Sequence, residues 1–178
     1  ITKDAQFGEM NFTYEKCTAI RSYRPKPKLN RVVVEEAAKL INEAKKPYLL
    51  IGQGIMLSNA EKELLAFVEK IGIPVASTLL GLGAFPYNHP QYVGFLGMHG
   101  DYAPNIKTNE CDVLIAVGMR FDDRVTGDVS RYAKQAKVIH VDIDASELNK
   151  IINADVAIHA DAKEALNLLT ELVTKKEH

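Results

Sequence analysis

Short apolar runs, each followed by a glycine-bearing or charged turn and then by a helical pattern, constrain the fold of this chain most. Val113–Val117 contains no polar residue, as expected of a parallel strand that is buried on both faces. Similar runs predict the other strands, at 48–51, 73–77, 92–96, 137–142 and 156–158. Strands that alternate with helices predict an α/β fold, a doubly wound parallel sheet of about six strands with flanking helices and right-handed crossovers.

Several residues predict where helices begin and end. Asn30 is expected to cap a helix that Pro47 terminates, and Gly72 is expected to end the following helix in a left-handed conformation. Three pairs have the spacing of a capping box at a helix start, namely Ser58 with Glu61, Asp144 with Glu147 and Asp161 with Glu164. A weaker helical pattern covers 129–134.

The first 30 residues differ from the rest of the chain. They show little periodicity, and Pro25 and Pro27 stand among lysines and arginines, which indicates an extended linker or arm. We therefore expect an arm at 1–30, which follows a preceding domain, and a single α/β domain at 31–178. The chain also begins at Ile1 without a methionine, so we expect it to be a piece of a larger protein.

Composition argues against several classes of partner. A net charge of −1 disfavours a nucleic acid or an anionic membrane surface, which a basic face would bind. No apolar run approaches the length of a membrane span, and no signal peptide is recognisable. Cys17 and Cys111 are the only cysteines and are far apart in the sequence, which favours reduced thiols in a cytosolic protein. No histidine has metal-ligand spacing with either of them.

The turn that follows Val113–Val117 carries the strongest functional signal. Gly118 ends the strand, and Arg120, Asp122, Asp123 and Arg124 follow within six residues. Ligands of open α/β sheets bind at the carboxyl ends of the strands, and two guanidinium groups suit a phosphate-bearing ligand. The alternative is that these four charged side chains pair with one another on a solvated turn.

Glycines follow four of the predicted strands, at Gly52 and Gly54, Gly81 and Gly83, Gly97 and Gly100, and Gly118. Glycine allows backbone N–H groups to approach a ligand closely, although turn geometry alone can require it. No G-x-G-x-x-G motif is present, so the usual dinucleotide fingerprint is missing.

Few side chains suggest catalysis. Asp142 ends a predicted strand and could accept hydrogen bonds from a ribose, whereas Asp144 is expected to cap a helix. His99 lies between glycines with no partner that the sequence can assign, and such a histidine is more often an ordinary polar loop residue. No self-contained catalytic set is recognisable.

Four segments together resemble the central domain of the acetohydroxyacid synthase (acetolactate synthase) family, which depends on thiamine diphosphate. These are the segments 77–83, 95–100, 118–127 and 140–144, and the resemblance extends from about residue 1 to 163. It implies a Rossmann-like middle domain that holds FAD with no redox role in the net reaction. A first domain would bind the thiamine pyrimidine, and a third would bind the diphosphate and Mg²⁺.

The resemblance also implies a set of site residues but no catalytic residue in this chain. The residues expected to contact FAD are Gly52, Gln53, Gly54, Thr78, Leu79, Leu96, Gly97, Met98, His99, Gly118, Met119, Arg120, Phe121, Asp122, Asp123, Arg124, Asp142, Ile143, Asp161 and Ala162. Those expected at the substrate and inhibitor channel are Lys3, Met98, His99, Asp122, Asp123 and Arg124.

The family's reaction is the condensation of pyruvate with a second 2-keto acid in branched-chain amino-acid biosynthesis. The partners implied are the two flanking domains, further copies of the chain and a regulatory subunit, in the cytoplasm or in a plastid or mitochondrion. We expect this chain alone to be inactive. Two alternatives remain: a structural middle domain of a related thiamine-diphosphate decarboxylase or oxidase without flavin, and a stand-alone nucleotide-binding regulator.

Overall fold

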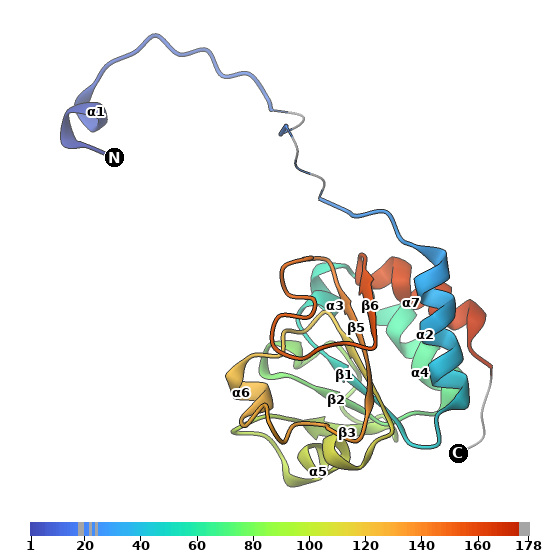
Figure 1. Cartoon of the computed structure of the whole chain (residues 1–178). Coiled ribbons are helices and arrows are strands. Elements are labelled where there is room, and N and C mark those ends of the chain that lie inside the picture. The colour runs from blue at the N-terminus through green and yellow to red at the C-terminus, as the bar shows by residue number, and fades with distance from the viewer. Residues whose placement is uncertain (18–19, 22, 24, 175–178) are drawn as a thin grey trace.

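The protein contains one sheet of six parallel strands in the order β3-β2-β1-β4-β5-β6 (Figure 1). The structure is a computed structural model that describes residues 1–17, 20–21, 23 and 25–174. The strands are β1 (Pro47–Ile51), β2 (Val75–Ser77), β3 (Tyr92–Phe95), β4 (Val113–Val117), β5 (Lys137–Asp142) and β6 (Val156–His159). The doubly wound parallel fold expected from the alternation of strands and helices is confirmed.

Helices cover both faces of the sheet. α2 (Arg31–Glu43), α4 (Glu61–Ile71) and α7 (Ala162–Leu172) pack on one face, where strand residues such as Leu49 and Ile115 meet them. α5 (Tyr102–Glu110) and the segment 119–136, which contains α6 (Asp123–Thr126), cover the other face over Leu50 and Ala116. Because adjacent strand residues point to opposite faces, β1 and β4 are buried along their whole length.

The remaining described helices are short. α3 (Gly54–Leu57) follows β1, and a 3₁₀ helix, η1 (Leu79–Gly81), follows β2. α1 (Lys3–Phe7) lies near the start of the chain. Four residues make barely one helical turn, so the repeating hydrophobic pattern that reveals longer helices cannot identify α3 or α6.

Three of the expected helix boundaries are confirmed. The Asn30 side chain accepts a hydrogen bond from the Val32 N–H at 3.1 Å, and the Asp161 side chain accepts one from the Lys163 N–H at 2.9 Å. Gly72 ends α4 at φ 64°, in the left-handed region. Each residue meets backbone groups that a helix end leaves unpaired.

Two of the expected capping boxes are wrong. The Ser58 hydroxyl donates to the Gly54 carbonyl at 2.8 Å and so closes the end of α3, while α4 begins only at Glu61. The Asp144 carboxylate accepts the N–H and hydroxyl of Ser146, which closes a turn that no helix follows. Residues 129–134 likewise form turns, because Asp128 bonds locally to Ser130 instead of starting a helix.

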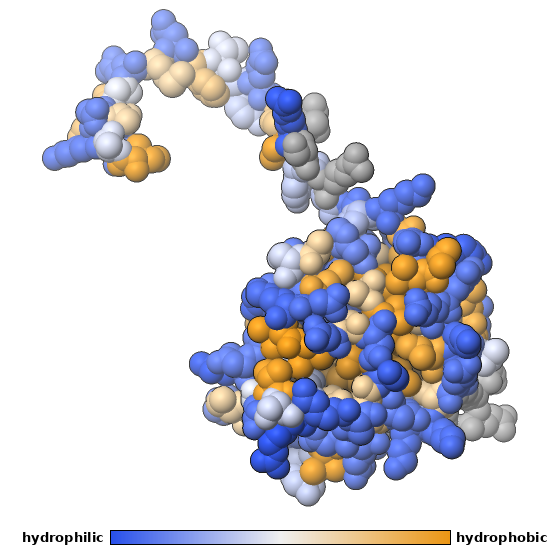
Figure 2. Space-filling model, viewed as in Figure 1, coloured by the Kyte–Doolittle hydropathy of each residue, from blue (hydrophilic) through white to orange (hydrophobic). Residues whose placement is uncertain are grey.

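Residues 1–17 are exposed throughout and lead away from the sheet (Figure 1). Figure 2 shows hydrophobic side chains on this arm among hydrophilic ones, and Ile1, Phe7, Met10 and Phe12 are mostly exposed. Closer to the sheet, the Lys26 ammonium lies 3.1 Å from the Asp161 carboxylate. Within the described ranges, no helix combines the length and apolar character needed to cross a membrane.

Candidate functional site

The strand order creates a crevice between the ends of β1 and β4. Chain connections leave these two neighbours in opposite directions, because β2 and β3 lie on one side of them and β5 and β6 on the other. Ligands of open α/β sheets bind outside the carboxyl ends of the strands at such a point. A cavity of about 580 Å³ lies there, within the range of small-molecule and cofactor sites.

Backbone groups form the floor of this cavity. The Gly52 N–H donates to Val117 O at 3.1 Å, and a Cβ atom placed on Gly52 would lie 2.3 Å from Gly118 O. The backbone pairing of β1 with β4 therefore continues into the turns that follow the two strands. These turns lie so close together that only glycine fits at position 52. The strand-end glycines have a geometric role here that does not depend on a ligand.

Positive charge lies at one end of the cavity. Arg120 and Arg124 both line it, and most of each side chain is exposed. Arg120 lies 3.7 Å from the Asp122 carboxylate, and Arg124 lies 2.8 Å from that of Asp123. The internal pairing considered from the sequence therefore exists, but exposed pairs of this kind are weak and leave donors for a ligand.

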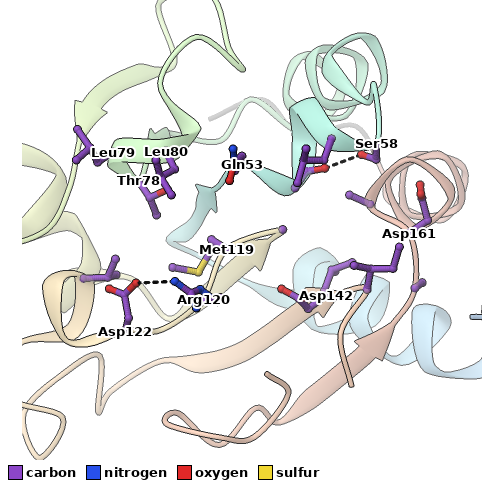
Figure 3. A pocket seen from close by; sticks show the side chains of 18 of the residues that line it. Gln53, Ser58, Thr78, Leu79, Leu80, Met119, Arg120, Asp122, Asp142 and Asp161 are labelled. Atoms are coloured by element: carbon purple, nitrogen blue, oxygen red, sulfur yellow. Dashed lines mark hydrogen bonds and ion pairs between the residues drawn. The ribbon is translucent and has the colours of Figure 1, made fainter. Parts of the chain in front are cut away.

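Buried carboxylates lie toward the other end. Figure 3 shows Arg120 and Asp122 on one side of the cavity, with Asp142 and Asp161 farther along it. Asp142 is 8% exposed, and its Oδ1 accepts the Asp144 N–H at 2.8 Å. Burial raises the pKa of Asp142, since a carboxylate loses hydration there. Asp161 is 3% exposed, and its carboxylate also contacts Lys26.

Apolar side chains line the wall opposite the β4 turn. Thr78, Leu79 and Leu80 lie across the cavity from Met119 and Arg120 in Figure 3. Leu79 and Leu80 are more than half exposed although they are large and apolar. A planar aromatic ligand could cover them, and burying such side chains would stabilise the complex.

The structure brings most of the expected FAD contacts together. The cavity is lined by Gln53, Gly54, Thr78, Leu79, Gly118, Met119, Arg120, Asp122, Arg124, Asp142, Ile143, Asp161 and Ala162. It is also lined by residues that the sequence did not assign to the site, namely Leu57, Ser58, Leu80, Val125, Val141 and Ala160. Among these, Leu57 and Leu80 had a usable signal, because each is a large apolar residue in the connection that follows a strand, where α3 and η1 lie.

Other expected contacts do not line the cavity. Leu96 and Phe121 are buried in the hydrophobic cluster on the α5 face of the sheet, and Gly52 is buried beneath the residues that line the cavity. The segment 97–99 lies beside α6, where the Met98 N–H donates to Arg124 O at 2.8 Å. Asp123 points its carboxylate to Arg124, outside the cavity lining. Lys3 begins α1, far along the arm from the sheet (Figure 1).

The site is suited to binding. It offers exposed guanidinium groups, buried carboxylates, glycine turns and an apolar wall, a combination that matches a ligand with phosphate, hydroxyl and aromatic parts. In the described part of the chain, no group of three or more His, Cys, Asp or Glu residues is arranged to hold a metal ion.

A family model and individual relatives were found among known proteins, and they agree with each other. The family model described as "Thiamine pyrophosphate enzyme, central domain" matches residues 34–169. The acetolactate synthase large subunit of Corynebacterium glutamicum is 46% identical over 171 residues, which is 96% of this chain and 27% of the relative. That of Buchnera aphidicola subsp. Schizaphis graminum is 43% identical over 170 residues, or 96% of this chain and 30% of the relative.

A solved structure has the same fold. Benzoylformate decarboxylase from Polynucleobacter necessarius superposes with a TM-score of 0.72 at 22% identity, over 94% of this chain and 31% of that chain. The chain thus spans about 30% of the length of the curated relatives that it matches.

Proposed function

Because the chain belongs to the thiamine pyrophosphate enzyme family, in which it matches the central domain, we propose that it is the FAD-binding central domain of an acetolactate synthase large subunit. The full protein would condense pyruvate with a second 2-keto acid. The flanking domains, which this chain does not span, would bind thiamine diphosphate and Mg²⁺. Other copies of the chain and a regulatory subunit are the proposed partners.

One observation carries the proposal: the cavity at the β1–β4 switch point has guanidinium groups at one end and buried carboxylates toward the other. Arg120, Arg124 and the glycine turns would hold the diphosphate of FAD, since each guanidinium offers a fork of donors. Asp142 would accept a hydrogen bond from the adenosine ribose.

The residues present also fit the flavin half. Oδ1 of Asp122 is a buried atom for which the described part of the chain offers no hydrogen-bond partner, and a ligand donor would satisfy it. Leu79 and Leu80 would cover the isoalloxazine ring. The chemistry that FAD would supply here is a planar aromatic ring system for these side chains to cover.

The alternative is a structural middle domain that binds no flavin. The pairing of Arg120 with Asp122, and of Arg124 with Asp123, favours it, because both arginines already have a carboxylate partner. Under this alternative, residues 118–122 would only form a solvated link between β4 and α6.

Titration of the purified chain with FAD, ADP and FMN, followed by calorimetry and flavin fluorescence, tests the proposal. We expect saturable binding of FAD and ADP and much weaker binding of FMN, which lacks adenosine. Absence of FAD and ADP binding at millimolar ligand would favour the structural alternative. A separate assay with pyruvate, thiamine diphosphate and Mg²⁺ should yield no acetolactate from this chain alone, because those cofactors are proposed to bind elsewhere.

A further inference from the structure

A fully buried histidine lies directly behind the candidate site. His140 is 0% exposed and lies on β5, where it pairs in register with Ala116 of β4. Its Nε2 atom lies 2.9 Å from the carbonyl oxygen of Met119. Because a carbonyl oxygen only accepts, Nε2 must carry the proton and donate it. The imidazole therefore connects β5 to the turn that follows β4.

The same side chain lies next to Asp142. The two residues are two positions apart on one strand, so they share a face, and Nε2 of His140 lies 3.9 Å from Oδ2 of Asp142. Phe121 packs edge-on against the imidazole at a centroid distance of 4.9 Å. These contacts fix the ring from the β4 turn and from its own strand.

The other ring nitrogen has a different environment. Nδ1 of His140 is buried, and no group in the described part of the chain donates to it. Burial also lowers the pKa of His140, so the ring is neutral near pH 7. A buried nitrogen without a partner destabilises a fold, so packing alone would favour an apolar residue at this position. Unlike an apolar residue, His140 can donate the hydrogen bond to Met119.

We propose that His140 is a positioning residue for the ligand site. Through its Nε2 proton it holds the Met119 carbonyl, and so fixes the turn that carries Arg120 relative to Asp142 across the cavity. The inference rests on the proposed FAD binding and goes beyond it, since His140 does not line the cavity and touches no ligand.

Matched amide substitutions separate this role from simple packing. The amide nitrogen of glutamine can occupy the place of a histidine Nε2, whereas the shorter asparagine places its nitrogen near Nδ1. Both bury one amide, so they differ mainly in whether the bond to Met119 survives. His140→Leu removes the bond and also the unpartnered nitrogen.

The experiment compares FAD and ADP affinity, by calorimetry, with thermal unfolding for the wild-type chain and the three variants. We expect His140→Gln to bind within about threefold of the wild-type affinity. His140→Asn and His140→Leu should bind FAD and ADP at least tenfold more weakly, and His140→Leu should be as stable as His140→Gln or more so. If His140→Asn and His140→Leu bind like the wild type, His140 is only a packing residue.

A measurement on the wild-type chain does not depend on how the variants fold. Long-range ¹H–¹⁵N NMR distinguishes the two neutral tautomers, and we expect a proton on Nε2 of His140. A proton on Nδ1 would overturn the inference even if every variant unfolded. A wild-type chain that binds neither FAD nor ADP would instead refute the proposed function, whatever the tautomer.

Discussion

Gly54 and Gly118, which are 64 positions apart in the sequence, meet backbone to backbone at the switch point. The Gly54 N–H donates to Gly118 O at 2.9 Å, and a Cβ atom on Gly54 would lie 2.5 Å from the Cα atom of Gly118. Gly118 has φ 59°, a left-handed conformation, whereas Gly54 does not have a positive φ. Substitution of Gly54 therefore tests only whether a methyl group fits between the two turns, without the added strain of a positive φ.

We expect Gly54→Ala to destabilise the protein by about 1–3 kcal/mol and to abolish ligand binding, because the two turns must move apart to admit a methyl group. Chemical denaturation and calorimetry measure the two effects. Gly8→Ala is the matched control, since its Cβ atom would have no contact closer than 3.5 Å. Unchanged stability in Gly54→Ala would mean that the turns adjust freely.

Arg120→Ala should weaken FAD and ADP binding by about 10- to 150-fold, or roughly 1.5–3 kcal/mol, if its guanidinium bonds to the diphosphate. Calorimetric titration at a single salt concentration gives the affinity. Arg131→Ala is the control, because Arg131 is also an exposed arginine but lies outside the cavity. If the wild type, Arg120→Ala and Arg131→Ala bind with equal affinity, Arg120 does not contact the ligand and only pairs with Asp122.

Two substitutions separate the structural role of Asp142 from its proposed role in ligand binding. Asp142→Asn keeps an oxygen that can accept the Asp144 N–H, so the turn and the melting temperature should be nearly preserved. Asp142→Ala removes that acceptor and should cost about 0.5–2 kcal/mol of stability. If Asp142 also accepts from the ribose, Asp142→Ala should weaken FAD and ADP together and spare FMN. A destabilised Asp142→Ala protein with normal ADP affinity would contradict the ribose role.

His140 should make stability depend on pH. Its pKa in the folded protein is lower than in the unfolded chain, so the unfolded chain binds more protons and stability rises with pH through about 6.5. The stability that neutral His140 contributes is complete above its pKa in the unfolded chain. It is lost as the pH falls toward its pKa in the folded protein. The slope from this single group is at most about 1.4 kcal/mol per pH unit.

Urea denaturation at several values between roughly pH 5.5 and 7.5 measures that slope. In His140→Gln the slope should be smaller than in the wild type, since glutamine does not titrate. Burial raises the pKa of Asp142, so this carboxylate contributes a slope of opposite sign, in the wild type and in His140→Gln alike. Identical slopes in wild type and His140→Gln would show that burial does not perturb the imidazole.

The sheet could be predicted from sequence because its strands are buried on both faces and therefore stand out as apolar runs. The caps at Asn30 and Asp161 could be predicted because a long periodic helix follows each of them. Ser58 and Asp144 have the same local spacing, yet their side chains bond to nearby backbone groups and close turns instead. The spacing of residues in the sequence alone cannot predict whether such a side chain will cap a helix or close a turn.

The candidate site could be predicted less completely than the sheet. Strand ends indicate which turns converge, so Asp142 and Arg120 were predictable from the topology. The role of His140 was not, because its position within an apolar strand says nothing about the carbonyl that its ring meets 21 residues away. Leu96 and Phe121 follow strands as the cavity residues do, but their side chains turn into the core, a choice that depends on tertiary packing.

The cavity draws its walls from residues between Gln53 and Ala162, which come from the ends of five strands (β1, β2, β4, β5 and β6) and the start of α7. A ligand that touches all these segments can bind only while every one of them is folded. Any partial opening that detaches one segment must therefore also release the ligand, and ligand at 100 times its Kd would raise the free energy of each such opening by about 2.7 kcal/mol. Amide hydrogen exchange should slow together across β1, β4, β5 and α7, while the exposed residues 1–17 continue to exchange at their own rate.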